Sequence, residues 1–383
     1  MVVDPQWYPG REQALVKHTF LDSYLGALFN KMAQVGRNIV YIDGFAGPWK
    51  SVSENYDDTS FGIALRQLQG AKSQADGKVS FSAHLVEKSE ESYERLKTIA
   101  AQYPDININT YQDEFYNVLP KIIESIPKDA FSFFFIDPKG WDIDFEKLGS
   151  VFHQPNSEIV VNLMYDFLNR FIDHPDERIS DRLRNLVPTE RWRRALSEAQ
   201  GAKPAEREAK IIFAYCEAVR SAGSYSFVPS LRVRKPGHER VLYHLVYATR
   251  NAVGLEVFRR CQYQSLQTEA ISQTQVKRAA REERTQQSDF NFFDEDISSD
   301  PVSTLLRNEP ARASEAVLEL LKSNSEGIIY HDLWPIILES FQITKSQLAR
   351  EINHLRKEGK LRIPEWPSER HSVPQNGFLI LPA

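Results

Sequence analysis

The sequence predicts an α/β protein with a parallel sheet of the Rossmann type, followed by a small separate C-terminal domain. Short apolar runs, each the length of one strand, alternate with longer segments whose apolar residues recur at helical spacing. Such alternation implies right-handed crossovers and a parallel sheet covered on both faces. A polar segment rich in Gln, Ser, Thr and charge, over residues 262–308, then separates the sheet from a second group of helices.

The first element is an amphipathic helix over residues 13–32, in which apolar side chains recur on one face. Strands are expected at residues 39–42, 82–86, 106–111, 131–136 and 158–163, with helices at 60–68, 89–103 and 115–126 between them. Residues 165–225 are expected to form a helical insertion. Its residues 178–194 carry six Arg against two acids. This stretch is either a substrate-facing subdomain or a solvated helical face.

The sheet is expected to close with an antiparallel hairpin, because strand-like residues 226–234 and 241–249 flank the turn-forming Lys235-Pro236-Gly237-His238. We therefore place the first domain at residues 1–260. Residues 261–308 are interpreted as a helix that frays into a charged linker.

A winged-helix domain is predicted over residues 309–383. Its three helices are expected at 314–322, at 330–341 and from Thr344 onward, and its two strands at 361–363 and 378–381. Thr344 and Gln347 have the spacing of a capping box at the start of the third helix.

Composition limits the classes of function. The chain has 383 residues and a formal net charge of −5, so nucleic-acid binding would need a local basic patch. Cys216 and Cys261 are too few for a four-cysteine zinc site or a disulfide framework, although one bridge between them is an alternative. Neither a signal-peptide pattern nor an apolar run of membrane-spanning length is found, so we expect a cytoplasmic protein without a membrane partner.

Four predicted strands are followed by acidic residues at the edge where parallel sheets bind ligands. These residues are Asp43, Glu87, Asp113 and Asp137. Each alone is more often a helix cap or a turn former, but four in succession favour a ligand that carries a nucleoside. In the loop Asp43-Gly44-Phe45-Ala46-Gly47, the two glycines allow close approach of the backbone to such a ligand.

The absence of two phosphate-binding motifs narrows the choice of cofactor. The chain has no G-x-x-x-x-G-K-[ST] motif, and no G-x-G-x-x-G follows the first strand. S-adenosylmethionine has no phosphate, so it is the predicted cofactor; a dinucleotide-dependent reductase is a weaker alternative. The histidines show no zinc-hydrolase or zinc-deaminase pattern, and we predict no metal.

Five ordered segments carry a family resemblance: ALVKHTFLDSYLGAL, YIDGFAGP, HLVEKS, FFFIDPKGW and YHLVYATRNAVGLEVF. Over about residues 10–260 they resemble the three-Cys-motif partner (TcmP) family, predicted class I S-adenosylmethionine-dependent methyltransferases of bacteria. The first two segments and the Asp-Pro segment also resemble the RlmJ family of ribosomal-RNA adenine-N6 methyltransferases. The TcmP resemblance implies a partner protein with a three-cysteine motif, which this chain itself does not contain.

The resemblance also implies roles for particular residues. Lys17 and His18 correspond to a Lys-His pair that lies at the cofactor in the RlmJ family. Asp137 and Pro138 correspond to the Asp-Pro pair that holds an exocyclic amine, with Trp141 as the nearest aromatic residue after it. Lys139 stands where the family has an aromatic residue.

The loop after the first strand departs from the family as well, since Trp49 replaces a glycine. The two departures leave open an inactive, cofactor-binding adaptor or regulator that works through its winged helix. If the protein is instead an active enzyme, we predict that it methylates a base amine in DNA or RNA.

Positive charge is concentrated on the expected third helix and at the start of the wing. The candidate nucleic-acid contacts are Lys345, Arg350, Arg356, Lys357 and Lys360. Such residues are often merely solvated, and many winged helices bind proteins instead.

Overall fold

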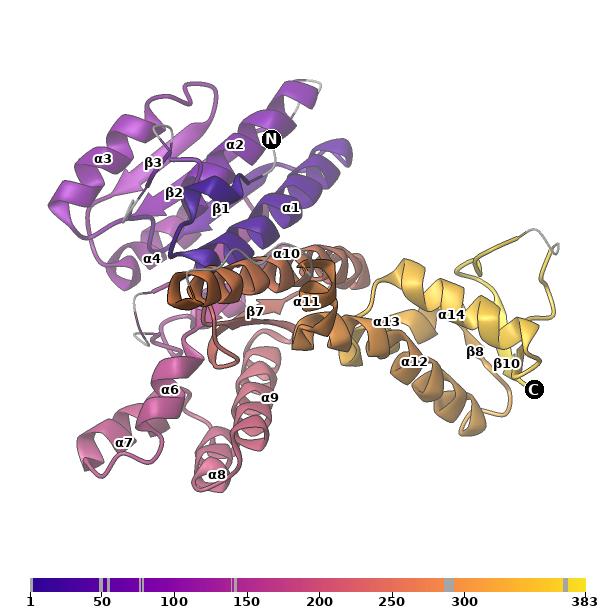
Figure 1. Cartoon of the computed structure of the whole chain (residues 1–383). Helices are drawn as coiled ribbons and strands as arrows, with labels where there is room; N and C mark the ends of the chain where they lie inside the picture. Colours follow the sequence, from indigo (N-terminus) through magenta and orange to yellow (C-terminus); the bar gives the residue numbers. More distant parts are fainter. Residues whose placement is uncertain are drawn as a thin grey trace. The chain divides into compact units, whose positions relative to one another are not determined.

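The computed structural model describes residues 3–47, 51–53, 56–75, 77, 79–138, 140, 143–285, 293–367 and 371–383. Contacts divide the chain into two compact units, Met1–Arg250 (unit 1) and Asn251–Ala383 (unit 2). Figure 1 shows both, coloured along the sequence.

Unit 1 is built on a seven-stranded sheet with the order β3-β2-β1-β4-β5-β7-β6. The strands are β1 (Ile39–Asp43), β2 (Phe81–Val86), β3 (Asn107–Tyr111), β4 (Phe131–Ile136), β5 (Ser157–Leu163), β6 (Ser230–Arg234) and β7 (Val241–Ala248). The first five are parallel, and β7 is antiparallel to both β5 and β6. The predicted Rossmann-like sheet is thus confirmed, with the second strand of the expected hairpin lying inside the sheet and the first at its edge.

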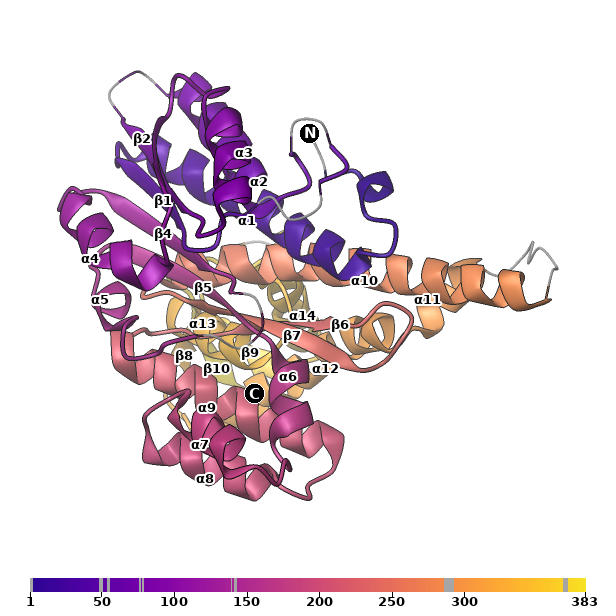
Figure 2. The same cartoon turned by 90° about the vertical axis from the view of Figure 1, so that its left-hand side faces the viewer.

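Helices cover both faces of this sheet (Figure 2). The helices of unit 1 are η1 (Pro5–Trp7), α1 (Glu12–Gln34), α2 (Ser60–Gln74), α3 (Glu90–Ala100), α4 (Phe115–Ser125), α5 (Gly149–Phe152), α6 (Tyr165–Phe171), α7 (Glu177–Asn185), α8 (Glu190–Ala199) and α9 (Pro204–Gly223). None of the described helices has both the length and the apolar character of a membrane-spanning segment.

Side chains of β1 point alternately to the two faces of the sheet, and this decides which of them face α1. Val40 and Ile42 belong to the apolar cluster that contains residues of α4, α5 and α9. Tyr41 points to the opposite face and packs edge-on against Phe29 of α1, with ring centroids 6.4 Å apart. Because side chains alternate along a strand, Asp43 shares the face of Tyr41. The end of β1 therefore presents its carboxylate toward α1.

The arginines of the helical insertion are paired with acids. The described pairs are Arg178–Asp176, Arg184–Asp181, Arg191–Glu217, Arg193–Glu190 and Arg194–Glu198. Such pairing with acids favours a solvated helical face over a free positive patch.

Unit 2 contains five helices and a small antiparallel sheet of order β8-β10-β9 among its described residues. They are α10 (Ala252–Thr285), α11 (Phe293–Ser299), α12 (Pro301–Lys322), α13 (Tyr330–Ser340), α14 (Lys345–Lys357), β8 (Ile328–Ile329), β9 (Leu361–Arg362) and β10 (Leu379–Pro382). The capping box is present: the Thr344 backbone N–H donates to Gln347 Oε1 at 2.8 Å, and the Gln347 N–H donates to Thr344 Oγ1 at 3.2 Å.

Regular helix extends further into the middle of the chain than the sequence pattern indicated. α10 continues to Thr285, and α12 begins at Pro301 rather than at Ser314. Asp300 caps α12 by accepting a hydrogen bond from the Val302 N–H at 2.9 Å. α10 buries apolar side chains from Leu255 to Ala270, and polar ones such as Gln262, Glu269 and Gln273 are buried on it as well.

Candidate active site

Two cavities open where β1 and β4 lie side by side. The chain passes from β1 to β2 and β3 on one side and from β4 to β5 on the other, so the order reverses between β1 and β4. Open α/β sheets bind ligands at such a switch point, beyond the carboxyl ends of the strands. Cavity A has a volume of about 330 Å³ and cavity B of about 260 Å³. Phe45, Asp137 and Pro138 line both cavities, so together these form one crevice.

The structure brings the described members of the predicted site to this crevice. Cavity A is lined by Gly44, Glu87 and Asp113, and cavity B by Lys17, His18, Asp43 and Gly47. Trp49, Lys139 and Trp141 lie outside the described residues. The predicted aromatic role of Trp141 therefore stays a prediction.

The two acids of cavity A differ in burial. Glu87 is 5% exposed, and its Oε1 accepts a hydrogen bond from the Ser89 N–H at 2.6 Å. Asp113 is exposed, and its Oδ1 accepts from the Glu114 N–H and from Asn117 Nδ2 at the start of α4. These bonds, led by that from Asn117, lower the pKa of Asp113. Asp113 thus also serves the start of α4, as the turn-former interpretation expected.

Cavity A has an aromatic wall formed by the predicted cofactor-binding residue Phe45 with Phe115 and Tyr116, and the latter two were not predicted. The rings of Phe45 and Phe115 lie 5.7 Å apart, and those of Phe115 and Tyr116 lie 5.4 Å apart. A Cβ on Gly44 would come within 2.9 Å of the Phe115 ring, so the glycine is required for this packing. The available signal was the Phe115-Tyr116 pair directly after the acidic end of β3.

The loop after β1 is fixed between its neighbouring strands. The Gly44 N–H donates to the Phe135 carbonyl at 3.2 Å, and the Ala46 N–H donates to the Val86 carbonyl at 2.8 Å. The loop thus crosses the ends of β4 and β2 and places Phe45 between the two cavities.

Asp137 is the polar centre of the crevice. Lys17 Nζ of α1 lies 2.6 Å from its Oδ2, and Asn162 Nδ2 of β5 donates to its Oδ1 at 2.5 Å. The Asp137 side chain is 16% exposed. Asn162 is buried, and its Oδ1 has no hydrogen-bond partner among the described residues. Asn162 was not predicted, although a polar residue inside the apolar run Ile159-Val160-Val161-Asn162-Leu163 was a visible signal.

Asp43 is buried beside Asp137. Its Oδ1 accepts from the Phe45 N–H at 3.0 Å, and its Oδ2 accepts from the Tyr41 hydroxyl at 3.2 Å. Burial, together with the negative charge of Asp137, raises the pKa of Asp43 to about 7 despite these two bonds. Cavity B therefore holds a carboxyl group that gains or loses its proton near neutral pH.

His18 is a neutral group in the wall of cavity B. Burial, followed by the nearby positive charges of Lys17 and Arg11, lowers its pKa well below the ordinary value. His18 Nδ1 lies 2.9 Å from the Tyr8 hydroxyl. A histidine that is neutral and oriented in this way offers hydrogen bonds rather than charge.

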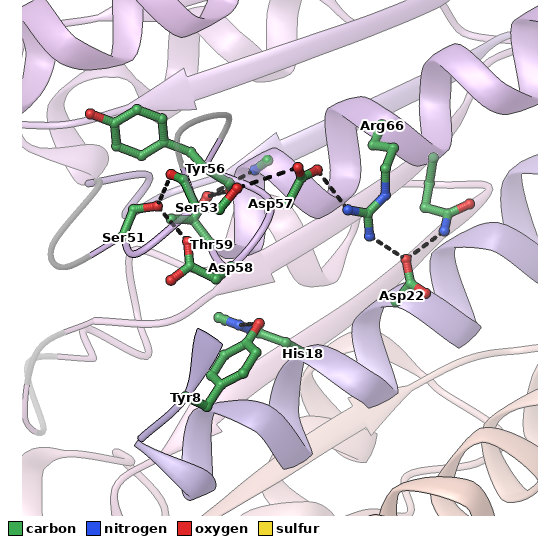
Figure 3. A network of polar contacts seen from close by, with 12 residues as sticks. Tyr8, His18, Asp22, Ser51, Ser53, Tyr56, Asp57, Asp58, Thr59 and Arg66 are labelled. Carbon is green, nitrogen blue, oxygen red and sulfur yellow. Dashed lines mark hydrogen bonds and ion pairs between the residues drawn. The ribbon is translucent and has the colours of Figure 1, made fainter. Parts of the chain in front are cut away.

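Asp58 fixes the segment that follows the β1 loop. Its carboxylate accepts from Arg11 Nη2 at 2.6 Å, from the Val52 N–H at 2.9 Å and from the Ser51 hydroxyl. Burial by itself would raise the pKa of Asp58, but these bonds outweigh it and lower the pKa. Figure 3 shows Asp58 beside Ser51 in this network.

A second ion-pair link lies on the α2 side of the same network (Figure 3). Arg66 of α2 bridges Asp57 and Asp22 of α1, with both N–O distances 2.7 Å. Two acid–arginine links therefore hold the described part of residues 51–59 against α1 and α2.

The five basic candidates of unit 2 fall into two groups. Lys345 and Arg356 each lie 4.2 Å from the centre of a tryptophan ring, and Lys360 Nζ lies 2.9 Å from Glu358. Arg350 and Lys357 are exposed, and they lie on one face of α14 because they are seven positions apart.

Metal and disulfide chemistry finds no support in the described part of the chain. No three His, Cys, Asp or Glu side chains gather there as a metal site would require. Cys216 and Cys261 are buried free thiols, so the alternative of one bridge between them is wrong.

A scan against protein-family models and a search of curated proteins find no match to this chain. Among solved structures, a Legionella pneumophila protein of the family DUF519 is similar at 10% identity and a TM-score of 0.40, over 68% of this chain and 94% of its own. The O-methyltransferase TomG of Streptomyces achromogenes, solved with S-adenosylmethionine, is similar at 14% identity and a TM-score of 0.32, over 59% of this chain and 79% of its own. These likenesses are too remote to support a function for this chain.

Proposed function

We propose that unit 1 is an S-adenosylmethionine-dependent methyltransferase that acts on a base amine of DNA or RNA. The observation that carries this proposal is the pairing of two chemically unlike cavities across Asp137 and Pro138. One cavity is aromatic with acids at its rim, and the other is lined by charged groups. A ligand with a nucleoside at one end and a zwitterion at the other matches this division.

The residues of the crevice fit S-adenosylmethionine. In cavity A, Phe45 and Phe115 offer ring surface to an adenine, and Glu87 offers a carboxylate to ribose hydroxyls. In cavity B, Asp43 would face the ammonium group, and Lys17 the carboxylate. The bound cofactor supplies a methyl group on a positively charged sulfur.

Asp137 would orient the target amine. Lys17 and Asn162 hold one carboxylate oxygen each, so the group has a fixed direction before the target arrives. Each oxygen has a further lone pair that can accept a hydrogen bond from an amine. Correct positioning of reactants contributes up to roughly 7–11 kcal/mol to such reactions. A target base in a duplex would have to be flipped out of the stack.

Unit 2 would assist in binding the nucleic acid. The order α12-β8-α13-α14-β9-β10 suits a winged helix, whose last helix enters a groove. Arg350 and Lys357 are the exposed basic residues of α14 that this interpretation uses. A three-cysteine-motif protein remains a proposed partner, on the sequence resemblance alone.

A test separates cofactor binding from methyl transfer. Calorimetry with S-adenosylmethionine should give saturable binding by the full chain, and a labelled methyl group should pass to total DNA or total RNA. Asp137→Asn should abolish methyl transfer while cofactor binding persists. The control is Asp144→Asn, which replaces a half-buried acid of the segment after β4 and should keep both cofactor binding and methyl transfer. Absence of cofactor binding would refute the proposal.

An inactive adaptor is the second candidate, because both oxygens of Asp137 already have a partner within the chain, Lys17 on Oδ2 and Asn162 on Oδ1. Cofactor binding without transfer to DNA or RNA would favour it.

A further inference from the structure

We propose that Arg170 and Arg240 form a phosphate-binding pair that contacts the backbone of the nucleic-acid substrate beside the Asp137 crevice. This inference rests on the proposed function, and it assigns to unit 1 a substrate contact of its own.

A single buried carboxylate holds the pair together. Asp166 of α6 lies 3.0 Å from Arg170 Nη2 through its Oδ2, and its Oδ1 pairs with Arg240, which precedes β7. The Asp166 side chain is 11% exposed, whereas those of Arg170 and Arg240 are 53% and 49% exposed. Two guanidinium groups share one carboxylate, so this cluster of three side chains has a net charge of +1.

The geometry of the cluster suits a phosphodiester. Each guanidinium has five N–H donors and uses only part of them on Asp166, so donors remain for phosphate oxygens. The Arg170 guanidinium also lies 5.5 Å from the centre of the Phe167 ring, which restrains it further. A single phosphodiester charge would neutralise the excess charge of the cluster.

The cluster lies at the same edge of the sheet as the crevice. Asn162, which donates to Asp137, precedes Asp166 by four residues, so their Cα atoms are at most about 14 Å apart. β7 runs antiparallel beside β5 with His244 opposite Leu163, which brings the start of β7 and Arg240 to this edge. Figure 2 shows α6 near this end of the sheet. The proposal places the target base at Asp137 and a backbone phosphate of the same strand at the cluster.

Neighbouring arginines differ in their ion pairing. Arg207 pairs with Asp173 at 2.9 Å and Arg232 with Glu208 at 2.7 Å, one acid to one arginine. Arg178 and Arg184 of α7 each pair with one acid as well. Arg191 and Arg220 also share one carboxylate, that of Glu217. The Arg170–Arg240 cluster is therefore distinguished by its place at the edge of the sheet where the crevice lies.

The test measures how salt affects binding of fluorescein-labelled 20-nucleotide strands of RNA and DNA, and of a DNA duplex, to the full chain. In Arg170→Gln/Arg240→Gln, the slope of log affinity against log salt should fall by about 0.7 for single strands or 0.9 for the duplex, as expected for one lost phosphate contact. Arg178→Gln/Arg184→Gln is the matched control and should keep the slope of the unmodified chain. Affinity for S-adenosylmethionine should be unchanged in both variants.

A variant that also carries Asp166→Asn guards against misfolding, because it leaves no unpaired buried carboxylate in the cluster. It should show the same reduced slope as the double variant. An unchanged slope in a folded double or triple variant would overturn the inference, as would absence of nucleic-acid binding by the unmodified chain. The proposed function fails separately, by loss of cofactor binding or of methyl transfer in the unmodified chain.

Discussion

Replacing Asp43 by Asn should make the protein more stable at pH 8 and slightly less stable at pH 4. Asp43 is buried at the end of β1, and the raised pKa of about 7 means that its ionised form is unfavourable in the folded protein. Asn has almost the same shape but cannot ionise.

The magnitude follows from proton linkage. The pKa of Asp43 is 3.8 when unperturbed and about 7 in the folded chain, a difference equivalent to about 4 kcal/mol. Between these pH values the folded protein keeps a proton that the unfolded chain has lost. Stability therefore falls as the pH rises through this window and levels off above about pH 7.

The stability of Asp43→Asn does not fall with rising pH in this way, because Asn has no proton to lose. The variant does, however, give up one hydrogen bond. An Asn carbonyl can accept from only one of the Tyr41 hydroxyl and the Phe45 N–H in the present geometry, at a cost of about 1 kcal/mol. At pH 4 part of the linkage loss is already present, so we expect Asp43→Asn to be about 0.5 kcal/mol less stable than the unmodified protein there and about 3 kcal/mol more stable at pH 8.

Urea unfolding at pH 4, 6 and 8, followed by circular dichroism, measures the difference between the two proteins. Titrations that they share cancel in this difference. Asp113→Asn is the matched control. The pKa of that exposed carboxyl is lowered, so the ionised form stabilises the folded protein, and the Asn variant should be slightly less stable than the unmodified protein at high pH, the opposite of Asp43→Asn. A stability difference for Asp43→Asn that does not change with pH would refute the reasoning.

Asp43→Asn also tests the site. If Asp43 faces the ammonium group of the cofactor, the variant should bind S-adenosylmethionine roughly 10- to 100-fold more weakly at pH 8, the usual range for a lost hydrogen bond to a charged group. Unchanged affinity would remove Asp43 from the proposed cofactor site.

Three further predictions concern other parts of the molecule. Gly44→Ala should lower the free energy of unfolding by about 1–3 kcal/mol and weaken cofactor binding in calorimetry, because the added Cβ would lie 2.9 Å from the Phe115 ring. Gly70→Ala is the control: open space surrounds Gly70, so neither stability nor cofactor binding should fall. Asn162→Ala should lower kcat for methyl transfer by about tenfold with unchanged cofactor Kd, through loss of one bond to Asp137; weaker cofactor binding at unchanged kcat would contradict a positioning role. Thr344→Ala should cost about 1 kcal/mol in urea unfolding, and Thr344→Ser, which keeps the cap, much less; equal losses would argue against the capping box.

Local sequence pattern was sufficient for the strands of unit 1 and for its helices α1 to α4. The run Phe131–Ile136 is apolar on both faces, as a central parallel strand must be, and the periodic apolar stripe of α1 fixed it as a helix. Pattern was less informative for α10, whose polar composition suggested fraying. Burial of one helical stripe outweighs average composition, and burial depends on what the helix packs against.

The site was predicted in part. The sequence predicted that the acids at the ends of β1 and β4 lie in one site, because the carboxyl ends of parallel strands meet at one edge of the sheet. Phe115 and Asn162 were missed because their relevance depends on neighbours far away in the sequence, Gly44 and Asp137 respectively. Sequence spacing did not predict the pairing of Lys17 with Asp137 either, because the two residues lie on elements far apart along the chain.

The amino-acid sequence alone establishes that strands and helices alternate, that four strands end in acids, and that no motif for a nucleotide phosphate follows the first strand. These are local properties, set by side-chain periodicity and turn chemistry. The folded chain was needed to learn that β7 lies between β5 and β6, that Lys17 and Asn162 share Asp137, and that two arginines share Asp166. Such pairings join residues distant along the chain, and packing and burial select them only when the sheet has formed.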